Sequence, residues 1–325
     1  MGQQDRQVLV AEDLRKSYGQ REALRGLSFS LNAGRILGFL GPNGAGKTTA
    51  IRILTTILEP SSGRFLVDGI GSDEPIRLRR RIGVLPESLG FPKNMTGTEF
   101  VTFYGRLYGL PTTLARAKAA AMIEAVGLQG RARSLIGTYS RGMRQRLGIA
   151  RALINDPAVV FLDEPTLGLD PQGQQELLKL VRWIARERNA GVILCSHQLA
   201  DVESVCDDVV ILNTGTVVAQ GPVADVIGSA DQQAVRVQVP PGSVAEAQQA
   251  LQGVPAVARV VSAGGTSGWL RVEIAPPGDS ARNGQHVHNT ILEGLIRAKV
   301  PVLGVQAGGA RLQDVFLQIT QGTIE

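Results

Sequence analysis

The segment Gly41–Thr49, GPNGAGKTT, constrains the fold of this chain more than any other part of it. It contains the pattern G-x-x-x-x-G-K-[ST], in which glycines let successive backbone N–H groups turn toward phosphate oxygens. The apolar run Ile36–Leu40 before it predicts a buried strand. Apolar residues recur after it at helical spacing, at Ile51, Leu54, Ile57 and Leu58. A strand, a phosphate loop and a helix N-terminus in this order predict an α/β fold that binds ATP or GTP. The alternative is a glycine-rich turn that binds no nucleotide.

The residues of the phosphate loop have distinct expected roles. The ammonium of Lys47 would reach the β- and γ-phosphates, and the hydroxyl of Thr48 would take a coordination position on Mg²⁺. The whole loop is expected to bind the nucleotide, through Gly41, Pro42, Asn43, Gly44, Ala45, Gly46, Lys47, Thr48 and Thr49.

A second apolar run, Ala158–Leu162, ends in the carboxylates Asp163 and Glu164. A short continuous apolar run is typical of a parallel strand covered on both faces, and its C-terminal end lies where α/β folds bind ligands. Asp163 suits a Mg²⁺ contact, and Glu164 suits a general base that deprotonates the attacking water. The alternative is a helix N-cap, because Pro165 follows and Pro171 is placed to begin a helix. The phosphate loop upstream favours the catalytic interpretation.

The segment Tyr139–Arg146, YSRGMRQR, opens a long predicted helix. It resembles the signature motif of the ATP-binding cassette (ABC) ATPases, usually written LSGGQ, with Ser140 and Gly142 retained. Other segments resemble elements of the same family in its order and spacing. They are the aromatic that stacks on adenine at Tyr18, the D-loop at Leu167–Asp170 and the switch histidine at His197. The resemblance covers residues 8 to 228, about two thirds of the chain.

This resemblance implies an α/β cassette over residues 1–228, with an antiparallel β subdomain and a helical subdomain at about 87–157. It implies an ATPase with ATP and Mg²⁺ as cofactors and with Lys47, Glu164 and His197 as catalytic residues. In the family, two cassettes sit head to tail, and each ATP lies between one chain's phosphate loop and the other chain's signature. A second cassette is therefore the expected partner, in a homodimer or a heterodimer. The signature residues Ser140, Arg141 and Gly142 would then face the ATP held by the partner. Asp170 of the D-loop is also expected to bind nucleotide.

Two positions depart from the family pattern. Glu87 replaces the glutamine of the Q-loop, and Arg141 replaces the first glycine of the signature. Glu87 could hold Mg²⁺ or water and adds a charge. Arg141 could add positive charge near the sandwiched phosphates, or it could be a solvated residue at a helix start. Both departures resemble ATPase subunits of bacterial exporters for drugs, antibiotics and cell-surface glycans, whose transmembrane permease is a separate chain.

Composition and charge describe an ordinary globular protein long enough for two domains, 43% hydrophobic and 19% charged. The N-terminus lacks the apolar run of a signal peptide, and no stretch reaches the about 20 apolar residues that span a bilayer. We therefore expect a cytoplasmic protein that reaches the inner face of the membrane through its permease. An arginine run at 77–81 has no interleaved aromatic residues for base stacking, so no nucleic-acid partner is expected. Cys195 and Cys206 are expected to be reduced.

Residues 229–325 are expected to form a small accessory domain after a linker at Gly228–Asp231. The elements predicted in order are the strand Val235–Val239, the helix Ser243–Leu251, the strands Val257–Val261 and Trp269–Ile274, the helix Val287–Lys299 and the strand Val302–Gln306. This βαββαβ order predicts an α+β, ferredoxin-like fold. A last helix is expected at Leu312–Thr320. His286 and His288 are more typical of a polar helix start than of a metal site, which would need a third ligand.

Three functions remain open from the sequence. The first is the ATPase subunit of an ABC exporter, which Glu87 and the signature Ser140–Met143 favour. The second is an importer ATPase with a regulatory domain. The third is a soluble ABC protein without a transport function, acting on ribosomes or DNA.

Overall fold

The computed structural model describes residues 6–88, 90–230, 234–255, 257–262, 268–274, 284–308, 312–313 and 315–316. The chain divides into two compact units between Val223 and Ala224. This division lies inside helix α8 (Val223–Ala230), close to the boundary expected after residue 228. The first unit contains two buried apolar clusters and the second unit contains its own.

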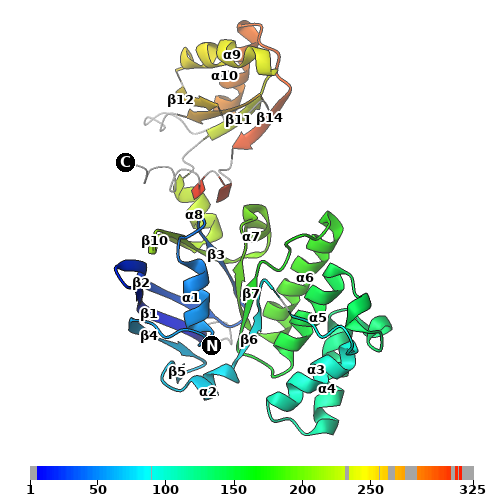
Figure 1. Cartoon of the computed structure of the whole chain (residues 1–325). Coiled ribbons are helices and arrows are strands. Elements are labelled where there is room, and N and C mark those ends of the chain that lie inside the picture. The colour runs from blue at the N-terminus through cyan, green and yellow to red at the C-terminus, as the bar shows by residue number, and fades with distance from the viewer. Residues whose placement is uncertain are drawn as a thin grey trace. The chain divides into compact units, whose positions relative to one another are not determined.

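A six-stranded sheet runs through the first unit (Figure 1). Its strand order is β10-β9-β3-β8-β7-β6. All neighbouring strands are parallel except β10, which pairs antiparallel with β9. The bounds are β3 (Ile36–Leu40), β6 (Ile82–Leu85), β7 (Val159–Asp163), β8 (Gly191–Cys195), β9 (Asp208–Asn213) and β10 (Thr216–Pro222). Every residue of β3 and β8 is buried, as in a parallel strand covered on both faces. The two strands predicted at Ile36–Leu40 and Ala158–Leu162 are confirmed, the second shifted by one residue.

A four-stranded antiparallel sheet with the order β2-β1-β4-β5 packs beside it. Its strands are β1 (Gln7–Tyr18), β2 (Arg21–Asn32), β4 (Ser62–Val67) and β5 (Ile70–Gly71). One apolar cluster joins the two sheets, with Leu9 and Leu27 from the antiparallel sheet and Phe39 and Phe161 from the six-stranded one. This confirms the predicted antiparallel β subdomain.

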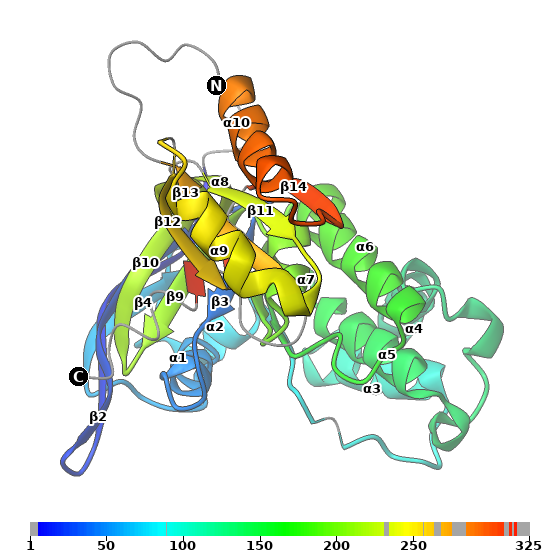
Figure 2. The ribbon, with the colours of Figure 1, turned by 90° about the horizontal axis from the view of Figure 1, so that it is seen from above.

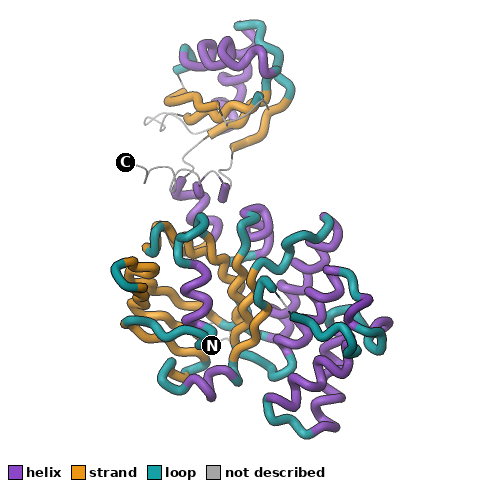
Figure 3. The backbone as a smooth tube through the Cα atoms, viewed as in Figure 1, coloured by secondary structure: helices purple, strands orange, loops and turns teal. Residues whose placement is uncertain are grey.

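The helices of the first unit cover the six-stranded sheet and extend beyond it (Figure 3). Their bounds are α1 (Lys47–Leu54), α2 (Pro75–Arg79), α3 (Gly97–Leu107), α4 (Thr112–Ala125), α5 (Arg141–Leu153), α6 (Pro171–Arg188) and α7 (Leu199–Val205), with single 3₁₀ turns at Gln129–Arg131 and Ile136–Thr138. The helices α3, α4 and α5 fall within the range 87–157 that was expected to be helical. A second apolar cluster joins these three helices and α6 to the sheet.

The helix after the phosphate loop is shorter than its apolar spacing predicts. It ends at Leu54, and Thr56 adopts a left-handed backbone with φ +61°. The hydroxyl of Thr55 donates to the carbonyl of Ile51 at 2.7 Å, which satisfies the last turn from a side chain. Ile57 lies beyond the helix and is 72% exposed. The prediction that Ile57 continues the helical face is therefore wrong.

The second unit contains a four-stranded sheet with the order β12-β13-β11-β14, in which every neighbouring pair is antiparallel. Its elements are β11 (Ala234–Gln238), α9 (Val244–Gln252) after a 3₁₀ turn at Pro241–Ser243, β12 (Val257–Ser262), β13 (Trp269–Ile274), α10 (Gly284–Arg297) and β14 (Gly304–Gly308). Both helices lie on one face of this sheet (Figure 2), with Leu251 and Leu295 packed against Val237 and Leu270. The predicted βαββαβ order and the ferredoxin-like fold are confirmed.

The linker predicted at Gly228–Asp231 is wrong over its first three residues, which lie in α8. Val223 and Val226 of this helix are buried, and this apolar spacing outweighs the small residues that follow. In the predicted helix Leu312–Thr320, residues 312–313 and 315–316 are helical, and the others lie outside the described residues. The side chains of His286 and His288 also lie outside them. Cys195 is buried, Cys206 is half-buried, and neither forms a disulfide.

Candidate active site

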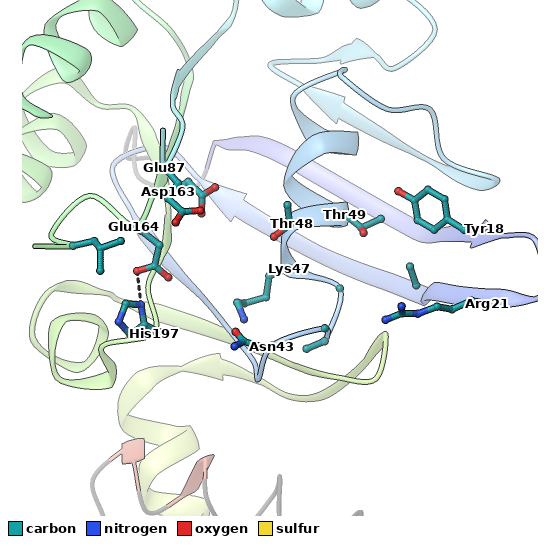
Figure 4. Close-up of a pocket in the computed structure, with 15 residues that line it drawn as sticks. Tyr18, Arg21, Asn43, Lys47, Thr48, Thr49, Glu87, Asp163, Glu164 and His197 are labelled. Atoms are coloured by element: carbon teal, nitrogen blue, oxygen red, sulfur yellow. Dashed lines mark hydrogen bonds and ion pairs between the residues drawn. The ribbon is translucent and has the colours of Figure 1, made fainter. Parts of the chain in front are cut away.

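A cavity of about 680 Å³ opens at the C-terminal ends of β3 and β7, where α1 begins (Figure 4). Residues distant in the sequence meet there, from the antiparallel sheet, the phosphate loop, the Q-loop and the ends of β7 and β8. Twelve of the predicted site residues line this cavity: Tyr18, Asn43, Gly44, Ala45, Gly46, Lys47, Thr48, Thr49, Glu87, Asp163, Glu164 and His197. The structure thus brings the expected nucleotide site together.

Two glycines of the phosphate loop are required by their surroundings. Gly46 has φ +107°, and a Cβ atom there would lie 2.6 Å from the carbonyl oxygen of Ala23. Gly41 has φ +155°, and its Cβ would lie 2.5 Å from the carbonyl oxygen of Leu212. The loop is therefore held tightly between β2 and β9. Gly46 is also the N-cap of α1 and provides no side chain, so the first N–H groups of this helix remain available to an anion.

Lys47 folds back over the loop that precedes it. Its ammonium donates to the carbonyl oxygens of Gly41 and, at 3.1 Å, Pro42. Burial lowers the pKa of Lys47, an effect that the nearby carboxylates of Glu164 and Asp163 oppose. The backbone carbonyls of Gly41 and Pro42 thus fix the position of the Lys47 ammonium.

Three carboxylates gather at the opposite end of the cavity. Asp163 is the last residue of β7, and Figure 4 shows its carboxylate close to that of Glu87. Burial raises the pKa of Asp163, and the negative charges of Glu164 and Glu87 raise it further. This concentration of negative charge fits a hard divalent cation, which prefers oxygen ligands.

Glu164 and His197 form a hydrogen-bonded pair beside this cluster. Nδ1 of His197 lies 2.8 Å from Oε2 of Glu164 (Figure 4). The backbone of Glu164 has φ +48°, a left-handed conformation that is unfavourable for a residue with a side chain. Two backbone hydrogen bonds hold this conformation. The N–H of Glu164 donates to the carbonyl of Cys195 at 2.9 Å, and the N–H of Leu167 donates to the carbonyl of Glu164 at 3.2 Å. The carboxylate is therefore fixed in direction by its backbone as well as by its histidine.

The signature residues stand apart from this cavity in the same chain. Ser140 is the N-cap of α5, and its hydroxyl accepts a hydrogen bond from the N–H of Met143 at 3.3 Å. Arg141 lies over the D-loop, since a Cβ atom on Gly168 would come within 2.7 Å of its guanidinium carbon. Among the described residues that line the nucleotide cavity, none is Ser140, Arg141, Gly142 or Asp170.

Three lining residues, Arg21, Ala23 and Leu167, were not among the predicted site residues, although Leu167 belongs to the segment matched to the D-loop. Arg21 begins β2 directly after the turn that follows Tyr18, so the hairpin brings it back to the same cavity. The short polar turn at 19–20 between two strands was the signal for this position. Ala23 contributes its backbone carbonyl to the cavity wall, where this group packs on the loop at Gly46. Every residue has such a carbonyl, so the identity of this side chain could not have predicted the contact.

The family model described as "ABC transporter" matches residues 24–167. The linearmycin resistance ATP-binding protein LnrL of Bacillus subtilis (strain 168) is 31% identical over 318 residues, covering 98% of this chain and 99% of that protein. The chain belongs to the ABC transporter family. The daunorubicin/doxorubicin resistance ATP-binding protein DrrA of Streptomyces peucetius is 33% identical over 322 residues, covering 98% of this chain and 94% of that protein.

The solved structure of cbiO1 from Clostridium perfringens, part of the ABC transporter complex cbiONQ, superposes with a TM-score of 0.64 at 29% identity. It covers 70% of this chain and 92% of cbiO1. This ABC protein is thus an ATP-binding subunit of a transporter, and it is an ATPase. The ABC transporter cassette MJ0796, which shares this fold, has been solved as a dimer. Among the described residues, no helix of this chain is long and apolar enough to cross a membrane itself.

Proposed function

We propose that this subunit binds Mg²⁺-ATP in the cavity described above and hydrolyses it with Glu164 as the general base. The observation that carries the proposal is the convergence of Lys47, Thr48, Asp163 and the Glu164–His197 pair on one cavity. Lys47 and the N–H groups of the loop bind the β- and γ-phosphates, and the ring of Tyr18 stacks on the adenine.

The metal site of this proposal is formed by the hydroxyl of Thr48 and the carboxylates of Asp163 and Glu87. A bound Mg²⁺ would neutralise charge on the phosphates and on this cluster. The raised pKa of Asp163 supports it, because a cation there would relieve the repulsion among the carboxylates.

Glu164 is placed to accept the proton of the attacking water. Its carboxylate is mostly buried, with 15% of the side chain exposed, whereas His197 is 58% exposed. His197 orients the carboxylate through Nδ1 and has its other ring nitrogen available for the γ-phosphate.

A second cassette completes the site in this proposal. Ser140, Gly142 and Asp170 line no part of the cavity in their own chain, which leaves them available to an ATP bound by a partner. The helix start at Ser140 would supply N–H groups to that phosphate chain. A homodimer with an isologous interface is the simplest assembly.

We further infer that the transporter is an exporter of a drug-like or antibiotic compound. The names of the relatives LnrL and DrrA, both resistance proteins that align over nearly the whole chain, support this inference. The partner would be a transmembrane permease on a separate chain, so that the subunit acts peripherally at the cytoplasmic face of the membrane. The loop around Glu87 would contact that permease.

Affinity purification of the tagged chain from detergent-solubilised membranes of its host tests the assembly. We expect one or two multi-spanning membrane proteins in stoichiometric amounts, and sensitivity to at least one antibiotic on deletion of the gene. Recovery of ribosomal or DNA-bound proteins instead would contradict a role in transport. ATP binding that is equally tight with excess EDTA would contradict the metal site.

A further inference from the structure

Glu87 is the single residue, among those described, that lines both the nucleotide cavity and a neighbouring cavity of about 320 Å³. The second cavity lies between the Q-loop and the start of α5. Glu87 is exposed, so its side chain has room to turn toward either space. The Glu87 carboxylate can therefore lie in either cavity, but not in both at once.

The charges on the two sides of Glu87 differ. On the nucleotide side it shares the cavity with the carboxylates of Asp163 and Glu164. On the other side the cavity is lined by the cations Lys93, Arg141 and Arg144. Within the part of the chain that the structure describes, none of these three side chains makes a hydrogen bond or an ion pair, and Glu87 makes neither. Without a metal ion, electrostatics therefore favours movement of Glu87 toward the cations.

Arg141 differs from the other two cations in what it touches. Its guanidinium covers Gly168, which has φ +72° and no side chain to displace it. Gly168 follows Leu167, and Leu167 lines the nucleotide cavity beside Glu164. Arg141 thus bridges the signature helix and the D-loop of its own chain while facing the cavity that Glu87 can enter.

We propose that Arg141 is a positioning residue that draws Glu87 into the second cavity when no nucleotide is bound. With nucleotide and Mg²⁺ bound, the Glu87 carboxylate would turn back toward Asp163 and leave Arg141 unpaired. In this proposal the two departures from the family pattern, Glu87 and Arg141, form one pair of opposite charges. It links the signature helix to the state of its own nucleotide site, and its release step rests on the proposed metal role of Glu87.

Hydrogen exchange measured by mass spectrometry on the nucleotide-free full chain tests the pairing directly. The readout is amide exchange in peptides that span the Q-loop, residues 84–95. We expect Arg141→Gln and Glu87→Gln each to raise exchange there by about two- to five-fold, the scale of one exposed ion pair. The double variant should exchange no faster than either single variant. Arg141→Lys should stay near wild type.

Arg106→Gln provides the matched control, because Arg106 is an exposed arginine of the same helical subdomain that does not line this cavity. It should leave Q-loop exchange unchanged. Effects of Arg141→Gln and Glu87→Gln that add in the double variant, or no effect of Arg141→Gln, would overturn the pairing.

A second arm adds Mg²⁺ and a non-hydrolysable ATP analogue at saturation. The difference between wild type and Arg141→Gln should then disappear. If the pairing is present without nucleotide and persists with it, the release step is wrong, and so is the proposed metal role of Glu87. An analogue that fails to bind to wild type would instead refute the nucleotide site.

Discussion

Replacing Glu164 by glutamine separates chemistry from binding at this site. Glutamine has the same shape, and its amide can still form a hydrogen bond with Nδ1 of His197, which lies 2.8 Å from Oε2 in the native pair. The left-handed backbone at φ +48° and its two hydrogen bonds do not depend on the side chain's charge. We therefore expect the fold and ATP affinity to be retained.

The amide cannot accept a proton, so the general base is lost. A positioned base contributes about 10²- to 10⁴-fold to the rate. This corresponds to about 2.7–5.4 kcal/mol of activation free energy, at about 1.36 kcal/mol for each factor of ten. We expect kcat to fall by a factor within this range. If the proposed dimer forms, its ATP-bound state should accumulate because ATP is no longer hydrolysed.

Phosphate release under saturating Mg²⁺-ATP gives the turnover, and titration with a fluorescent ATP analogue gives the affinity. Glu187→Gln is the control, since it removes the same charge from an exposed position of α6. Turnover of Glu164→Gln at the wild-type rate, with affinity unchanged, would refute the assignment of the base. A loss of affinity alone would show that Glu164 binds ATP instead of activating water.

Three further substitutions test other parts of the structure. Gly46→Ala should abolish binding of the fluorescent ATP analogue, because its Cβ would lie 2.6 Å from a backbone carbonyl, whereas Gly109→Ala, with φ +88° and open space, should bind normally. Tyr139→Phe removes the 2.7 Å hydrogen bond from the Tyr139 hydroxyl to the carbonyl of Arg131. It should therefore lower the free energy of unfolding of the first unit in urea by about 1 kcal/mol. An unchanged free energy would mean that water replaces this bond. Leu270→Ala should destabilise the second unit by about 2–5 kcal/mol while ATP affinity stays constant, and a parallel loss of affinity would contradict separate cores.

The central parts of the site were predictable because their signals are local in sequence. The phosphate loop is one continuous segment, and Asp163 and Glu164 directly follow an apolar run. Parallel strands end at one edge of a sheet, so these segments had to converge once the fold was α/β. The βαββαβ order of the second unit was predictable for a similar reason, since each element has its own apolar period.

Other features depend on contacts between distant segments and were missed. The packing of Arg141 on Gly168 joins the signature to the D-loop across 27 positions of sequence, and neither residue signals the other. Arg21 reaches the nucleotide cavity only because β1 and β2 form a hairpin. Helix ends were also missed, as at Thr55, where a hydroxyl bonded to the backbone ended a helix that the apolar spacing would have extended.

The left-handed backbone at Glu164 has a consequence for how this protein would respond to selection. A residue with a side chain held in that conformation costs about 1 kcal/mol or more, which glycine would largely avoid. Random mutagenesis followed by selection for thermal stability alone would therefore enrich glycine at position 164. The selected variants would be more stable but unable to hydrolyse ATP. Glutamate would be retained at position 164 only if the library were also selected for transport activity.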